Sequence, residues 1–135
     1  MNGPDATMMK PVGRLASFMR TLDDGLLRDC FADNVVITEN FPPHIFHGSD
    51  AVARWREGFI QHAAALRDLE YSFGAAQDFL CTDGTAYFVL PTLWKGIVSG
   101  RSFEEDGGWA FVLRQSGEHW RIAGYAWAVT AMRFP

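Results

Sequence analysis

One acidic residue follows two apolar residues on the same predicted face of a short strand. In the segment FADNVVITENFP, which begins at Phe31, the two-residue period of a strand places Val35, Ile37 and Glu39 on one side. If that side packs on a core, Glu39 is partly withdrawn from water, which disfavours its charged form. A carboxylate whose pKa lies near neutral pH can take up and return a proton, so Glu39 is a candidate general base.

Two other interpretations of acidic residues stay open. Glu39 could instead lie at a sheet edge, where it would reach water or pair with an arginine such as Arg54 or Arg101. Asp106 could be a second catalytic carboxylate that points toward the cavity, provided that no bulge interrupts its strand. The acidic run around Asp106 is also typical of a solvated strand end.

The histidines are candidates for ligand binding rather than for a metal site. His62 lies on the apolar side of a predicted helix, either as a core histidine or as a polar group inside a pocket. His44 is in the proline-rich loop that follows Glu39. Because close spacings such as HxH or HxxxH do not occur, we expect no metal, and the lack of a dinucleotide or phosphate-binding glycine motif leads us to expect no cofactor.

Aromatic side chains are numerous enough to suggest the wall of a pocket in addition to a core. Tyr and Trp combine an apolar ring with one polar atom, a combination suited to a small, apolar, ring-bearing ligand. The aromatic candidates for ligand binding are Phe18, Trp55, Phe59, Trp94, Trp109, Tyr125 and Trp127.

The periodicity of the chain predicts helices first and a sheet afterwards. Apolar residues at helical spacing predict three helices, at residues 11–23, at about 24–31, and from 51 to about 66 or 68. The period then changes to two, which predicts four antiparallel strands at about 69–82, 85–95, 101–115 and 119–130. We expect bulges or bends at Gly74, Pro91 and Gly107. This order indicates an α+β domain whose sheet wraps the helices.

Composition limits the classes of partner. With 135 residues, of which 48% are hydrophobic, the chain can form one domain at 11–135 after a loose lead-in at 1–10. The net charge of -4 and the scattered Lys and Arg argue against nucleic-acid binding. No signal pattern or membrane-length apolar run is present, so we expect a cytoplasmic protein with no membrane partner. Cys30 and Cys81 lack metal-ligand spacing, and we expect reduced structural thiols.

The strand that ends near Glu39, the proline-rich loop after it and the sequence HGSD together carry a family resemblance. They resemble the ketosteroid-isomerase-like branch of the nuclear transport factor two superfamily, which also holds the SnoaL-like cyclases. In those isomerases the catalytic Asp stands at the position that Glu39 matches. The resemblance implies a cone-shaped fold, with three N-terminal helices packed on a strongly bent antiparallel sheet that encloses a pocket.

The sequence departs from the isomerase pattern at the two donors of the oxyanion hole. In the family these donors are a tyrosine and a protonated aspartate, and our alignment places Phe18 and Ala110 there. Loss of one such donor typically costs about 3 kcal/mol of transition-state stabilisation, so we do not expect efficient steroid isomerisation.

Three functions remain as hypotheses. The first is a cofactor-free isomerase, dehydratase or cyclase that uses Glu39 as its base. The second is a non-catalytic protein that binds an apolar metabolite, and the third is an interaction module. Because helices on one side of a sheet leave the other side bare, we also expect a homodimer formed through the sheet.

Overall fold

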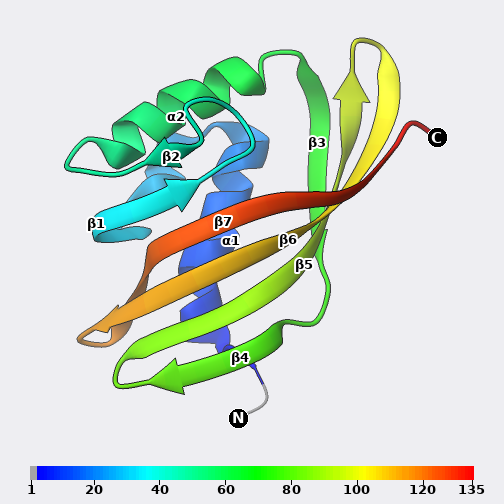
Figure 1. The fold of residues 1–135 in the computed structure, drawn as a ribbon. Helices are drawn as coiled ribbons and strands as arrows, with labels where there is room; N and C mark the ends of the chain where they lie inside the picture. Colours follow the sequence, from blue (N-terminus) through cyan, green and yellow to red (C-terminus); the bar gives the residue numbers. More distant parts are fainter. Residues whose placement is uncertain (1–2) are drawn as a thin grey trace.

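A computed structural model describes residues 3–135 and places the helices against one face of a curved sheet (Figure 1). The helices are α1 (Ala6–Thr21), the short 3-10 helix η1 (Asp24–Leu27) and α2 (Ala51–His62). The strands are β1 (Phe31–Thr38), β2 (Ile45–Phe46), β3 (Leu66–Phe73), β4 (Gln77–Thr82), β5 (Thr85–Val98), β6 (Arg101–Ser116) and β7 (His119–Arg133). The α+β class predicted from the sequence is therefore confirmed.

The sheet is mixed rather than purely antiparallel, which corrects one part of the expected architecture. Its order is β2-β1-β7-β6-β5-β3, and β4 also pairs with β5. β1 runs parallel to β7, whereas the other pairs are antiparallel. The N–H of Ile122 donates to the carbonyl of Cys30 at 2.7 Å, which fixes the start of β1 beside the start of β7. As a result, β1 delivers Glu39 to the concave side of the long strands.

The described residues form two α-helices rather than the three helices expected, because the segment predicted as the second helix is only the 3-10 helix η1. It ends at Leu27, because the backbone of Arg28 is already extended, and Asp29 then adopts a φ of 60°, so the helix does not continue toward Phe31. The first helix begins at Ala6 rather than at residue 11, since Asp5 caps it by accepting a 2.9 Å hydrogen bond from the N–H of Met8. α2 stops at His62, earlier than predicted.

The apolar stripe of α1 packs on the concave face of the sheet. Val12, Leu15 and Phe18 have no exposed surface, in agreement with their helical spacing. Each such side chain contributes about 1.5–3 kcal/mol when it is buried fully. The stripe therefore holds α1 firmly beneath the sheet and makes Phe18 part of the core.

The long strands bend near the positions that the sequence indicated. A break at Gly74 divides the strand expected at 69–82 into β3 and β4. Pro91 of β5 lies opposite this break, so its missing N–H costs no ladder hydrogen bond there. The pairing of β6 with β7 shifts register between Asp106 and Gly107, as predicted for Gly107. A Cβ at Gly107 would collide with the ring of Trp127, so only glycine lets that ring lie across β6.

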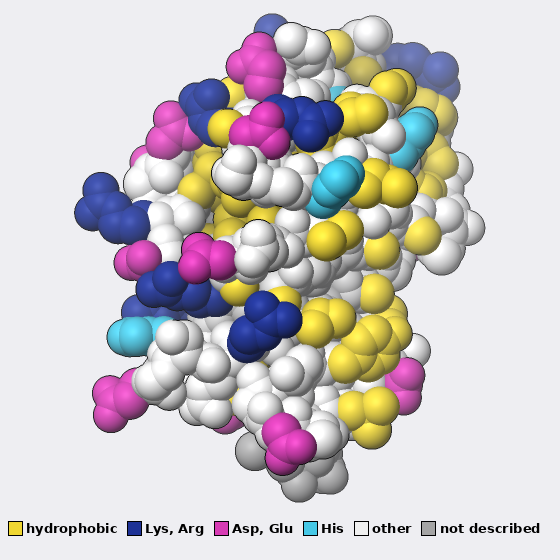
Figure 2. Space-filling model, turned by 60° about the vertical axis from the view of Figure 1, so that its left-hand side comes forward, with side chains coloured by type: hydrophobic (Ala, Val, Ile, Leu, Met, Phe, Trp, Pro, Cys, Tyr) yellow, Lys and Arg dark blue, Asp and Glu magenta, His cyan; other side chains and the backbone are white. Residues whose placement is uncertain are grey.

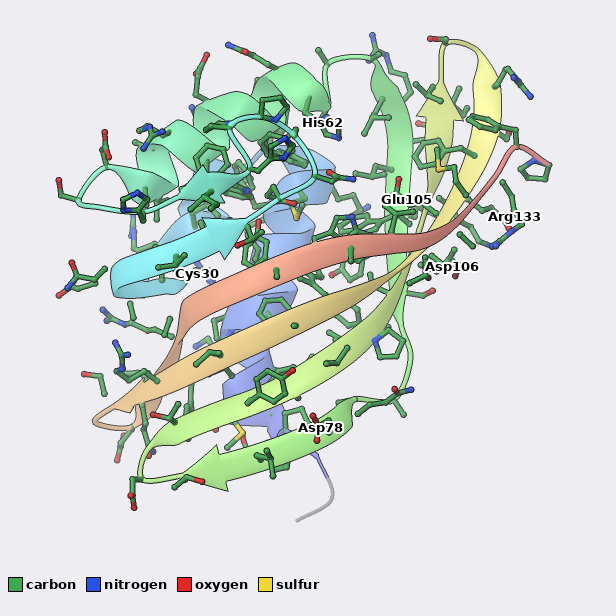
Figure 3. All side chains as sticks on the ribbon, viewed as in Figure 1. Cys30, His62, Asp78, Glu105, Asp106 and Arg133 are labelled. Carbon is green, nitrogen blue, oxygen red and sulfur yellow. The ribbon has the colours of Figure 1, made fainter. Side chains whose placement is uncertain are left out.

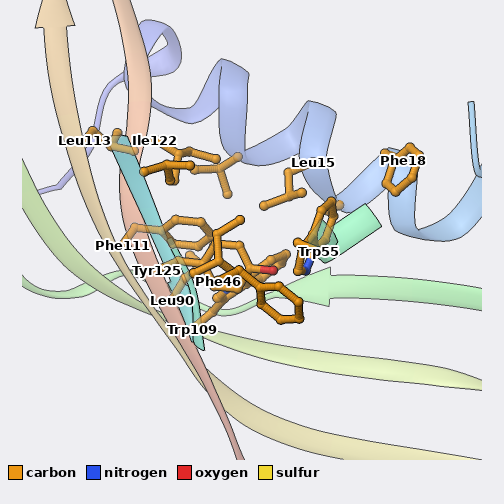
Figure 4. Packing of buried hydrophobic residues seen from close by; sticks show 14 of the residues in the cluster. Leu15, Phe18, Phe46, Trp55, Leu90, Trp109, Phe111, Leu113, Ile122 and Tyr125 are labelled. Carbon is orange, nitrogen blue, oxygen red and sulfur yellow. The ribbon is translucent and has the colours of Figure 1, made fainter. Parts of the chain in front are cut away.

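Aromatic and aliphatic side chains from both helices and the long strands form one core (Figure 4). Trp55 of α2 and Trp109 of β6 are among its largest fully buried members. Cys30 is buried and Cys81 is exposed, and both thiols are free. Within the described residues, no helix is both long and apolar enough to span a membrane.

Candidate active site

Glu39 follows the last residue of β1 and is buried, with 5% of its surface exposed. The predicted alternation holds: Val35 and Ile37 are buried with it, whereas Val36 between them is exposed. A tight loop then fixes the backbone, because the N–H of Glu39 donates to the carbonyl of His44 at 2.8 Å. Strand parity and this loop together direct the carboxylate inward.

Two side chains far apart in the sequence hold one oxygen of this carboxylate. The indole N–H of Trp55 donates to Oε2 of Glu39 at 2.9 Å, and the hydroxyl of Tyr125 donates to the same oxygen at 2.5 Å. Among the described residues, none donates to Oε1, and the buried unpaired side-chain atoms are Trp109 Nε1 and Arg121 Nε. Oε1 is therefore neither bonded nor fully enclosed, and it is free to act on a ligand.

The environment of Glu39 favours its neutral form more than water does. The pKa of Glu39 is raised to about 7: burial is the largest cause, the hydrogen bonds from Tyr125 and Trp55 act in the opposite direction, and the nearby charge of Glu105 adds to the increase. Burial and the neighbouring Glu39 raise the pKa of Tyr125 well above its usual value, so its hydroxyl remains a donor. A buried carboxyl that titrates near pH 7 can accept and release a proton under physiological conditions.

Glu39 pairs with neither Arg54 nor Arg101, the arginine partners considered from the sequence. Arg54 forms an ion pair with Asp50 at 3.9 Å, and the guanidinium of Arg101 lies 4.6 Å from the centre of the Phe134 ring. Within residues 3–135 no ion pair involves Glu39. The burial of Glu39 is thus not compensated by a positive charge, which is unusual for a purely structural carboxylate.

A cavity of about 240 Å³ opens beside Glu39. Its walls are mainly apolar and aromatic, and its polar members are Glu39, Asn40, His62 and Glu105. The remaining lining residues are Met19, Phe41, Phe59, Leu66, Leu69, Trp94, Val98, Phe103, Trp109, Trp127 and Met132. An apolar hollow with a few polar groups is the usual form of a small-molecule site.

Glu105 is a second carboxylate of the cavity, and the sequence analysis did not select it. Burial raises its pKa, and the indole of Trp127 acts against this by favouring the charged form. Glu105 has the strand parity of Phe103 and Trp109, both buried. Large aromatic side chains at alternate positions of β6 were the signal that could have identified the inner face.

Asp106 lies on the opposite side of β6 from Glu105. Its carboxylate accepts a 2.6 Å hydrogen bond from Arg133, and Figure 3 shows the two side chains together at one end of the sheet. Ala110 shares this outer parity, so the inward positions nearest to it are Trp109 and Phe111. The structure therefore does not bring Asp106 together with Glu39, and Ala110 does not face the cavity.

The other candidates fall into two groups. Phe59, His62, Trp94, Trp109 and Trp127 line the cavity with Glu39. Phe18, Trp55 and Tyr125 lie behind its wall, where Trp55 and Tyr125 hold the carboxylate and Phe18 packs against Trp55 with ring centres 5.7 Å apart.

The histidines take positions at the edge of the site. His62 is exposed at the rim, stacked on Phe41 at 4.9 Å between ring centres, and partial burial lowers its pKa. His44 is exposed, and its ring Nδ1 lies 3.0 Å from the carbonyl oxygen of Glu39. In the described part of the chain, no group of three or more His, Cys, Asp or Glu side chains is arranged to hold a metal ion.

Comparison with known proteins identifies the fold. No protein-family model matches the sequence, and no curated protein matches it significantly. Solved structures do match: hexachlorocyclohexane dehydrochlorinase LinA-type3 from Novosphingobium barchaimii LL02 superposes with a TM-score of 0.81 at 8% identity, over 96% of this chain and 88% of that one. The chain has the nuclear transport factor two-like fold.

Two further structures share this fold, both from Novosphingobium aromaticivorans. A protein assigned as a scytalone dehydratase matches with a TM-score of 0.76 at 11% identity, covering 96% of this chain and 85% of that one. A protein assigned as an aromatic ring hydroxylase matches with a TM-score of 0.76 at 16% identity, covering 96% and 91% of the two chains. At such low identity, the similarity establishes the nuclear transport factor two-like architecture and not a shared activity.

Proposed function

We propose that the cavity binds a small, apolar, ring-bearing molecule and that Glu39 acts on it as the general base of a cofactor-free isomerase, dehydratase or cyclase. One observation carries this proposal: a buried carboxyl with a pKa of about 7 has one oxygen anchored by two donors and the other oxygen free at an apolar cavity. This combination supplies a base of suitable strength in a fixed position.

The anchored oxygen and the free oxygen have different tasks in this mechanism. Oε1 takes a proton from a carbon of the ligand, and the electron pair of the broken C–H bond moves into the ring system. Tyr125 and Trp55 keep the carboxyl group oriented through Oε2 during this step. The protonated Glu39 then returns the proton, either to another carbon in an isomerisation or to a departing hydroxyl group in a dehydration.

Structural neighbours lend support to a reaction of the elimination type. One carries the name of a dehydrochlorinase and another is assigned as a dehydratase. Both names describe the removal of a small molecule from a substrate. The chain described here offers the general base that such a reaction requires, together with a cavity of about 240 Å³. That volume lies below the roughly 300–1,000 Å³ of common ligand pockets, which favours a ligand of one or two rings.

Proton exchange provides the direct test of this function. Small ring compounds with acidic C–H bonds, among them cyclic ketones and β-hydroxy ketones, are incubated with the protein in D₂O and followed by NMR. We expect at least one compound to exchange or eliminate faster than in buffer alone. Binding of these compounds without any such acceleration would contradict catalysis and support the second candidate.

That second candidate is a non-catalytic binding protein for an apolar metabolite. The observation that favours it is the position of Phe18, which is fully buried against Trp55 and Phe59 and has no hydroxyl group to stabilise a developing negative charge. Under this candidate, Glu39 serves only as a hydrogen-bonding group for the ligand.

We also propose that a second copy of the chain covers the outer face of the sheet. Val89, Ala110 and Ala126 are cross-strand neighbours there, and each remains partly or largely exposed. Figure 2 shows hydrophobic side chains gathered over one part of the surface and many charged side chains elsewhere. Small side chains allow another sheet to approach closely, and an apolar face of this kind favours a symmetric dimer.

Sedimentation tests this assembly. At micromolar concentration we expect a species of twice the 15.1 kDa chain mass. Ala126→Glu places a charge on the outer face and should shift the protein toward the monomer, whereas Ala53→Glu on the exposed side of α2 should leave the dimer intact. A wild-type protein that sediments only at 15.1 kDa would rule out this dimer.

A further inference from the structure

Glu105 is a carboxylate of the cavity that the mechanism above does not use. It lines the same cavity as Glu39 and keeps part of its surface accessible. Its neighbours in the chain, Glu104 and Asp106, both form ion pairs with Arg133. Figure 3 shows Asp106 beside Arg133 and Glu105 apart from them. In the described part of the chain, no basic side chain forms an ion pair with Glu105.

At least one carboxylate oxygen of Glu105 is open to a ligand. The indole of Trp127 favours the charged form of Glu105, but its single N–H serves only one of the two oxygens. The second oxygen has no donor among the described residues, and it is not one of the buried side-chain atoms that lack a partner. An oxygen that is neither bonded nor enclosed keeps accessible surface, so a ligand can reach it.

Two tryptophan rings border this carboxylate. Trp94 lies directly opposite Glu105 on the neighbouring strand β5, and Trp127 approaches from β7. Both rings line the cavity, and each packs on Trp109 with ring centres 6.0 Å apart. The face of an indole ring attracts positive charge more strongly than that of Tyr or Phe. Aromatic rings gathered beside a carboxylate are thus suited to an organic cation.

The cavity has no positive charge of its own. Among the described residues that line it, none is Lys or Arg, and burial lowers the pKa of His62, which favours its neutral form. The charge of Glu105 contributes to the raised pKa of Glu39, so the two carboxylates repel each other across the cavity. A cationic ligand would relieve this repulsion, whereas an anionic ligand would add to it.

We propose that Glu105, Trp94 and Trp127 bind a positively charged nitrogen of the ligand, so that the ligand class is a small ring compound with an ammonium or iminium group. The inference rests on the proposed function and narrows its ligand to an organic cation.

A cationic nitrogen also suits proton removal by Glu39. When Glu39 takes a proton from the carbon next to an iminium carbon, the C–H electron pair forms a C=C bond and the π pair of the C=N bond moves to nitrogen. The product is a neutral enamine. Because no negative charge develops on the ligand, the hydroxyl group that Phe18 lacks is not required.

A matched pair of probes tests this assignment. Phenyltrimethylammonium and tert-butylbenzene have nearly the same shape, and only the first is charged, at any pH. Dissociation constants for both are measured by NMR titration at pH 8 with wild-type protein and with Glu105→Gln. The control is Glu104→Gln, which removes the same charge from the adjacent residue of β6, outside the lining of the cavity.

The expected result is a preference for the cation that depends on Glu105. Wild-type protein should bind phenyltrimethylammonium about tenfold more tightly than tert-butylbenzene. Glu105→Gln should lower this ratio by about fivefold or more, and Glu104→Gln should leave it unchanged. The carboxyl resonance of Glu105 gives a second readout in wild-type protein: its pKa should fall when the cation binds and should not fall with tert-butylbenzene. This readout decides the question if Glu105→Gln does not fold.

The contrary outcomes separate this inference from the function on which it rests. If tert-butylbenzene binds as tightly as the cation, or if the ratio is the same in wild-type protein and Glu105→Gln, the cation site is overturned while the pocket for a ring compound stands. If neither probe binds to wild-type protein, the proposed pocket fails, and the inference fails with it.

Discussion

Glu39→Gln should lower turnover by about a hundredfold or more on any compound that wild-type protein converts in the exchange assay. The amide oxygen of Gln can still accept the hydrogen bonds of Trp55 and Tyr125, so the side chain keeps its place. The variant loses only the ability to take up a proton. Ligand affinity should therefore stay close to that of wild-type protein, and the loss should appear in kcat rather than in KM.

A matched control makes this experiment decisive. Glu70→Gln introduces the same change on an exposed side chain of β3 and should leave turnover unchanged. Full activity of Glu39→Gln would end the catalytic interpretation of Glu39. An inactive variant that also lost its fold would not support catalysis, so a melting curve accompanies each measurement.

The stability of the protein should fall as pH rises through the titration of Glu39, and Glu39→Gln should abolish that dependence. The pKa of Glu39 is about 7 in the folded protein against 4.5 for a free side chain. Folded protein thus binds the proton more tightly, and the resulting stability is present below about pH 4.5 and is lost as pH rises through about 7. A shift of this size corresponds to about 3 kcal/mol in the free energy of unfolding.

Urea denaturation of both proteins at pH 5 and pH 8 measures this effect. Glu39→Gln should be similar in stability to wild-type protein at the lower pH and more stable by up to about 3 kcal/mol at the higher pH. Glu39→Leu should behave differently and lose stability at both pH values, because it leaves the donors of Trp55 and Tyr125 unpaired. A constant difference between wild-type protein and Glu39→Gln across this range would show that Glu39 has an ordinary pKa.

Glu105 offers an internal check on the same titration. Its charge raises the pKa of Glu39, so Glu105→Gln should lower that pKa and narrow the range over which stability changes. The carboxyl resonance of Glu39 in an NMR titration reports the pKa directly. An unchanged midpoint would mean that the two carboxylates do not interact across the cavity.

Local patterns in the sequence were sufficient for the burial of Glu39 and for the class of fold. The alternation of Val35, Ile37 and Glu39 needs only the period of a strand, and the stripe of α1 needs only the period of a helix. The change of period near Leu69 separated the helical part from the long strands. These features follow from backbone geometry, which every residue of an element shares.

Local patterns failed where the outcome depended on a single residue or on pairing between distant strands. The extended backbone of Arg28, followed by the left-handed Asp29, ended a helix that the apolar residues favoured. The parallel pairing of β1 with β7 joins segments far apart in the sequence. The sequence analysis selected Asp106 as a second carboxylate of the cavity. Adjacent residues of a strand point to opposite faces, and in the fold Glu105 lines the cavity instead of Asp106.

The sequence alone determined that a carboxylate at position 39 would share the buried side of its strand. Only the tertiary structure decided what that carboxylate can do. Its two donors come from α2 and β7, and the cavity beside its free oxygen is lined by residues of α1, α2, β3, β5, β6 and β7. Burial without a positive partner raises a pKa, and that absence becomes visible only when all neighbouring elements are in place.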